Sequence, residues 1–229
     1  ALKNHKTYTL YEEPSALATS NGVDVVVDEN LPYNQVYALT NANNFNGLNI
    51  EAIDGTLHIG VSISIFGHNR CLVYVPSVAY ERVALKGGSD FLWNSCNSDV
   101  LSISVSGGGD CQIKGVTQKL SIDSSGGADV KCDELEAEDI TINASGGSDC
   151  QIKGVTQQLS IDSSGGADVK CDELEAEDIT IDASGGSDID AVANSTLSLT
   201  ASGGADIHIK GNPQIVHWDI SGGADVEFN

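Results

Sequence analysis

Apolar and polar residues alternate over most of the last two thirds of the chain, in runs separated by pairs of glycines. With the first glycine of each pair as position zero, +4 and +6 are apolar and +5 is mostly polar, as in Val169, Lys170 and Cys171. A second run precedes each pair, with apolar residues at −6 and −4 and a polar residue between them, as in 179–181. Alternation with a period of two predicts strands that bury one side.

The glycine pairs recur every 18 to 20 residues, and a small residue and Asp follow each of them. The pairs begin at Gly87, Gly107, Gly126, Gly146, Gly165, Gly185, Gly203 and Gly222. Residues 111–149 and 150–188 are two copies of one block that differ only at Lys119/Gln158 and Asn143/Asp182. Such a period is typical of a solenoid, in which each unit buries its apolar edge against its neighbours.

The sequence therefore predicts an all-β fold, a single-stranded parallel β-helix of about eight coils over residues 81–229. We expect a right-handed helix, because crossover connections are overwhelmingly right-handed. Residues 1–80 have looser strand-like runs and should form an N-terminal β cap continuous with the solenoid. Within them, Asp54-Gly55 indicates a hairpin or tight turn. The glycine pairs should form corners with positive φ, and the structural turns are expected at Gly126, Gly146, Gly165, Gly185, Gly203 and Gly222.

The charge restricts the possible partners. The chain has 33 acidic and 11 basic residues, a net charge of −22. Such a charge argues against binding nucleic acid or an anionic membrane surface. No apolar run approaches the roughly 18 residues of a transmembrane span.

Four of the six cysteines are expected to be free thiols within the core. Cys111, Cys132, Cys150 and Cys171 fall at inward positions +4 and +6 of successive coils. Neighbours would be offset by one coil and two residues, which places their Cα atoms about 8 Å apart, beyond the ~7 Å that a disulfide spans. Small buried apolar residues describe them best.

An aspartate follows every glycine pair, and these aspartates should stack into a column along the solenoid. One interpretation is structural, with each carboxylate accepting hydrogen bonds from the N–H groups of its corner. The other is calcium binding, since hard cations take several oxygen ligands. The candidate metal residues are Asp129, Asp149, Asp168, Asp188 and Asp206. We expect no cofactor, with calcium as the one alternative.

Two further surfaces carry candidate chemistry. The outward residues at −5 and −3 form a polar face that could hydrogen-bond a glycan, although ordinary outward strand residues explain it equally well. The candidate ligand-binding residues are Ser160, Asp162, Thr180, Asp182, Ser198 and Thr200. Acidic blocks lie at 133–139 and 172–178. They could form a solvent-exposed charged edge that prevents lateral strand pairing, or they could bind cations.

Several ordered motifs resemble a bacterial family described as "putative auto-transporter adhesin, head GIN domain". They are Gly22-Val23-Asp24-Val25-Val26-Val27, residues 50–59 (Ile-Glu-Ala-Ile-Asp-Gly-Thr-Leu-His-Ile), Val73-Tyr74-Val75-Pro76 and the Ser-Gly-Gly-(Ser/Ala)-Asp repeats. The resemblance covers roughly residues 15–229. It implies a β-helical envelope or secreted protein of Gram-negative bacteria, often a lipoprotein, for which adhesion is proposed. It supplies no catalytic residue.

These observations predict a non-enzymatic, exported adhesin or display protein that binds a glycan or a surface protein through its outer face. The alternatives are a carbohydrate-binding or carbohydrate-acting β-helix, and a calcium-stabilised repeat protein. No spacing of the five histidines suggests a catalytic site. The last coil has no cap after it, so its apolar edge could join another copy or a partner.

Overall fold

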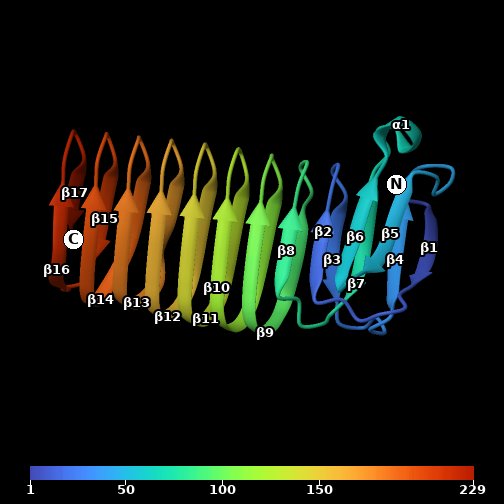
Figure 1. The fold of residues 1–229 in the computed structure, drawn as a ribbon, viewed down its shortest axis with the longest axis horizontal. Coiled ribbons are helices and arrows are strands. Elements are labelled where there is room, and N and C mark those ends of the chain that lie inside the picture. The colour runs from blue at the N-terminus through green and yellow to red at the C-terminus, as the bar shows by residue number, and fades with distance from the viewer.

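The computed structural model describes residues 1–229 as one long row of mostly parallel strands (Figure 1). Six long strands of 14 to 16 residues form successive coils. Each begins at the aspartate after one glycine pair, or in β9 one residue after it, and ends just before the next pair. They are β9 (Phe91–Val105), β10 (Asp110–Ser124), β11 (Asp129–Ala144), β12 (Asp149–Ser163), β13 (Asp168–Ala183) and β14 (Asp188–Ala201). The last coil consists of β15 (Asp206–Lys210), β16 (Gln214–Ile220) and β17 (Asp225–Phe228).

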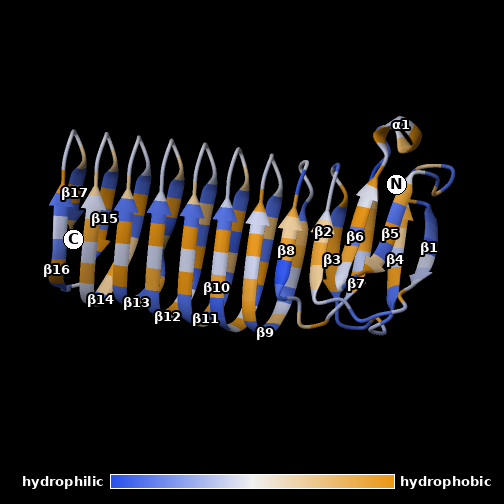
Figure 2. Ribbon diagram, in the orientation of Figure 1, coloured by the Kyte–Doolittle hydropathy of each residue, from blue (hydrophilic) through white to orange (hydrophobic).

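The predicted parallel β-helix is confirmed. Val169 pairs with Ile189, and Ile189 pairs with Ile207, so the apolar columns are continuous from coil to coil. The solenoid makes about seven turns, because the eight glycine pairs bound seven complete repeats. Figure 2 shows the resulting bands of apolar and polar residues across each strand.

One predicted position is wrong. Counting back from Gly222 puts Val216 at the inward −6 position, but Leu197 pairs with Ile215, and the register shifts before Ser198 pairs with His217. Val216 is therefore the extra residue of a β-bulge, which moves Ile215 to the inward position.

The coils continue into the first third of the chain, in an order that differs from the sequence. Parallel strands there are β2 (Ala16–Thr19), β3 (Asp24–Asp28), β6 (Thr56–Val61), β7 (Cys71–Pro76) and β8 (Arg82–Leu85). The coil of β2 and β3 lies between β6–β7 on one side and β8–β9 on the other. The earliest coil in the sequence is thus not the terminal coil of the stack.

Antiparallel strands close the N-terminal end. They are β1 (Asn4–Thr9), β4 (Gln35–Thr40) and β5 (Leu48–Ile53). β5 pairs with β6, β4 pairs with β7, and β1 pairs with β4. Ile53 pairs with Thr56, which confirms the hairpin signal at Asp54-Gly55. A short helix, α1 (Ile63–Phe66), replaces the tight corner between β6 and β7 and projects beyond the row of corners (Figure 1).

The interior is one cluster of 57 buried residues that runs through cap and solenoid. It is mostly aliphatic, but where the cap meets the solenoid Tyr80 and Phe91 pack edge-on against Trp93, with ring centroids 5.5 and 6.4 Å from it. The Tyr80 hydroxyl donates a 2.8 Å hydrogen bond to the Pro76 carbonyl. The irregular sequence at this junction therefore serves packing.

Backbone hydrogen bonds stack the corners directly on one another. The Gly186 N–H donates to the Gly165 carbonyl at 2.8 Å, and the same bond recurs one coil further on, from Gly204 to Gly185. The first glycine of each pair has a positive φ, 65° at Gly185, and a Cβ there would lie 2.8 Å from the Gly165 oxygen. The first glycine is therefore required both by conformation and by the close approach of the adjacent coil.

Replacing the first glycine should cost far more stability than replacing the second. Gly185→Ala should destabilise the protein by about 1–3 kcal/mol, because it combines a left-handed φ with a backbone clash. Gly186→Ala is the matched control, since its Cβ would lie at an ordinary 3.9 Å from the Gly165 oxygen. Thermal melts of the two variants compare them, and equal losses would contradict this account of the corner.

The four cysteines at positions +4 and +6 are buried and free, as predicted, and Cys71 and Cys96 are buried and free as well. Burial raises the pKa of the Cys71 thiol to about 12 and the pKa of Cys111, Cys132 and Cys150 well above the ordinary value. Ellman's reagent at pH 8 should therefore modify none of the thiols in the native protein and all six after denaturation. Fewer than six after denaturation without reductant would reveal a disulfide and overturn the register.

Candidate binding surfaces

The six predicted polar-face residues come together on one sheet. Ser160, Thr180 and Ser198 pair with one another in successive strands and form one column. Asp162, Asp182 and Thr200 form a second column two residues further along each strand. None of the six is buried, so the sheet presents a regular array of hydroxyl and carboxylate groups to solvent.

The hydroxyl column is longer than the sequence analysis proposed. Pairing extends it back through Thr141 and Ser121 to Ser102, so that six consecutive strands each contribute one hydroxyl. Alongside it lies a shallow pocket of about 510 Å³ whose polar lining includes Ser121, Thr141, Ser160 and Thr180. The repeat of Ser or Thr at −5 was the signal that could have identified the whole column.

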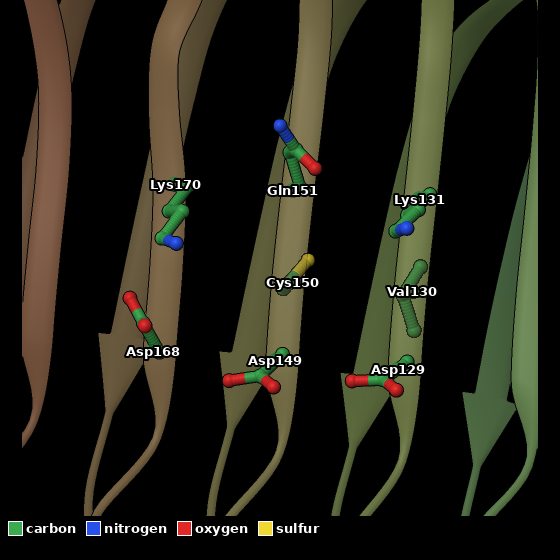
Figure 3. Close-up of a pocket in the computed structure, with 8 residues that line it drawn as sticks. All are labelled: Asp129, Val130, Lys131, Asp149, Cys150, Gln151, Asp168 and Lys170. Atoms are coloured by element: carbon green, nitrogen blue, oxygen red, sulfur yellow. The ribbon is translucent and has the colours of Figure 1, made fainter.

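The other sheet has a mixed-charge surface. Asp129, Asp149 and Asp168 pair in one column, and Lys131, Gln151 and Lys170 pair in the next outward column. Figure 3 shows the two rows crossing three coils, and together they line a pocket of about 330 Å³. The other predicted aspartates, Asp188 and Asp206, continue the first row.

Two carboxylates of this row, those of Asp149 and Asp168, have a raised pKa. Partial burial, followed by the charge of Asp129 and a hydrogen bond with it, raises the pKa of Asp149. Partial burial also raises the pKa of Asp168, although nearby Lys170 opposes the shift, and Asp149 and Asp188 add to it. Burial is the largest cause of both shifts, and the like charges stacked one strand spacing apart add to it.

The predicted hydrogen bonds from corner N–H groups to these carboxylates are wrong. In this column only Asp90 accepts a backbone N–H, and that N–H belongs to Asp110 of the next coil. At the corners where a serine precedes the aspartate, this serine makes the corner hydrogen bond instead. Ser148, fully buried, donates through its hydroxyl to the Ser145 carbonyl at 2.8 Å, and Ser187 does the same to Ser184 at 2.9 Å.

The structure forms no group of three or more His, Cys, Asp or Glu side chains that could hold a metal ion. The aspartates lie in single file, so most of them have carboxylates only above and below; Asp190, in the adjoining column beside Asp188, is an exception. The calcium interpretation stays a prediction for experiment.

The acidic blocks lie on the bends of β11 and β13, away from the glycine corners. Leu135 and Leu174 are buried there, while most of the acidic residues around them are exposed or half-buried. Two of the acids have basic partners, since Lys153 lies 2.6 Å from Glu173 and Lys210 lies 3.8 Å from Asp172. These pairs are exposed and contribute little stability.

A family model described as "putative auto-transporter adhesin, head GIN domain" matches residues 13–213. The chain belongs to this family. The match covers the repeat region up to β15, together with most of the cap, and β16 and β17 lie beyond it. No curated protein matches the chain.

Solved structures share the fold of this head GIN domain over almost its whole length. A putative lipid-binding protein from Parabacteroides distasonis superposes with a TM-score of 0.85 at 16% identity, covering 99% of this chain and 96% of that one. A putative adhesin from the same organism gives 0.85 at 18%, covering 98% and 96%. A putative adhesin from Parabacteroides merdae gives 0.78 at 18%, covering 99% and 95%. At these identities the likeness establishes the fold alone.

The family description implies a cell-surface or exported location. The head GIN domain contains no helix long and apolar enough to cross a membrane. Neither finding identifies a ligand, so the outward columns are the main evidence about binding.

Removing one charge from the aspartate column should stabilise the protein at neutral pH. Since the pKa of Asp168 is raised on folding, its ionised form destabilises the native state, and stability should increase as the pH falls through the folded pKa. Asp168→Asn mimics the protonated form, so its melting temperature should exceed that of the wild type at pH 7 and match it near pH 3.5.

Asp162→Asn, on the hydroxyl face, is the control and should change the melting temperature less. A lower melting temperature for Asp168→Asn at pH 7 would show that the carboxylate has a structural role.

The calcium interpretation is tested by melting the wild-type protein in millimolar calcium and in chelator. An unchanged melting temperature would rule it out.

Proposed function

We propose that this head GIN domain is a non-enzymatic adhesin or display module that binds through the outer face of its β-helix. The observation that carries the proposal is the unbroken hydroxyl column over β9 to β14, with a column of mainly carboxylate and amide groups beside it. A flat array with one hydroxyl about every 4.8 Å can hydrogen-bond an extended neutral glycan along many residues.

Charge also favours a neutral or cationic ligand. The net charge of −22 repels polyanions, and the column beside the hydroxyl column contains Asp123, Asp162 and Asp182. A neutral glycan or a basic patch on a surface protein is therefore the better partner. We place the protein in the periplasm, on the outer membrane or outside the cell of a Gram-negative bacterium, in keeping with the family and with the organisms of its structural relatives.

The alternative is a β-helix that cleaves carbohydrate. The most irregular outward surface is a pocket of about 280 Å³ beside α1, where Asp24, His68 and Arg70 lie. Burial, ahead of the charge of Asp90, raises the pKa of Asp24. This pocket is the first place to examine if the protein releases sugar fragments.

Binding should depend on the hydroxyl face. We expect the purified protein to bind part of an array of neutral bacterial, plant and host glycans without releasing fragments. The double variant Thr180→Lys/Ser198→Lys should lose most of this binding, because long charged side chains would interrupt the flat column. Gln151→Lys, on the other sheet, is the matched control and should bind normally.

No binding to any glycan on the array would contradict the glycan form of the proposal, and a basic surface protein would then be the next probe. Release of fragments would favour the enzyme alternative instead. Equal loss in both variants would show that binding does not occur on the hydroxyl face.

A further inference from the structure

The C-terminal end of the rod exposes the cross-section of its core. Ile215 and Trp218 of β16 and Phe228 of β17 occupy inward positions, yet they are 42%, 46% and 48% exposed. The rings of Trp218 and Phe228 stack across this end with centroids 5.9 Å apart. Both strands pair on one side only, so each also leaves an edge of backbone groups without a strand partner (Figure 1).

The two ends of the rod differ in this respect. At the N-terminal end β4 and β5 pair antiparallel with the outermost parallel strands, and inward residues such as Val36, Ala38 and Leu48 are buried. The C-terminal end has no equivalent closing strands. An apolar end with two open strand edges is a typical association surface.

A partner that covers this end must present two strand edges at the spacing of β16 and β17, with apolar side chains between them.

We propose that two copies of this chain join at their open C-terminal ends about a two-fold axis perpendicular to the rod. A second copy carries the same two strand edges and the same apolar core as the first. The two-fold axis makes every strand contact across the junction antiparallel. The apolar inward residues of one copy then cover those of the other. This inference goes beyond adhesion and does not depend on it, and it predicts a rod of double length with a cap at each end.

The charge distribution permits this contact. No inward position of the last coil holds a charged residue, and β16 and β17 contain no lysine or arginine to block an edge. The nearer acidic block, 172–178, lies in β13, two strands away from β16. That separation is about 10 Å, close to the Debye length at 0.1 M salt, so repulsion between the blocks of two copies would be strongly screened.

Light scattering and native mass spectrometry over a range of protein concentrations test the proposal. The wild type should show a dimer of twice 23.8 kDa, and small-angle scattering should show a rod of double length. Trp218→Lys and Phe228→Lys should each weaken dimerisation about thirtyfold or more, as expected for central apolar residues of an interface. Both side chains are half-exposed in one copy, so folding should survive, which circular dichroism checks.

Ile65→Lys is the matched control, because Ile65 is exposed on α1 near the opposite end and its replacement should leave the dimer intact. A small folded domain fused directly after Asn229 should abolish the dimer without altering the core, whereas the same domain fused before Ala1 should not. A monomer at every concentration up to about 100 µM, a dimer that survives all C-terminal changes, or chains longer than a dimer would each overturn the proposal.

Discussion

The structure depends on the direct stacking of one tight corner on the next. At each corner the first glycine has a positive φ, and at most corners a Cβ on it would lie only 2.8 to 3.1 Å from the backbone of the adjacent coil. This contact fixes the vertical register of every coil, because a slip of one residue would exchange inward and outward side chains. The apolar columns and the outward columns are therefore aligned by the same constraint.

Because the corners fix the register, the sequence alone could predict most of the solenoid. The pairing of Val169 with Ile189, the inward thiols and the polar columns all follow from counting residues from the glycine pairs. The cap could not be predicted in this way. Its first corner, Ser20-Asn21-Gly22-Val23-Asp24, has Asn21 with φ of 58° where the repeats have glycine, and its coil is inserted between two coils that come later in the chain.

At the candidate sites, counting residues from the glycine pairs was not enough to predict the side-chain contacts. Period-two alternation placed Ser160 and Thr180 in one exposed column, but it could not show what the aspartate carboxylates contact. A hydrogen-bonding role for Asp168 was plausible from its position beside a turn. The serines that precede some of the aspartates, such as Ser148 and Ser187, make the corner bonds instead. Alternation also failed at Val216, because a bulge inserts one residue without any signal from glycine or proline.

Apart from Asp90, the aspartates after the corners accept no backbone hydrogen bond that would explain their recurrence. Partial burial, with neighbouring carboxylates adding to it, raises the pKa of Asp149 and Asp168, so their ionised forms have an electrostatic cost. A constraint outside the folded core is the simplest physical explanation. One such constraint is solubility, since outward carboxylates along the whole row keep the rods from pairing side by side. The row stops at Asp225, at the one end where the apolar interior is open. A rod with charged sides and an apolar end is restricted to association through that end.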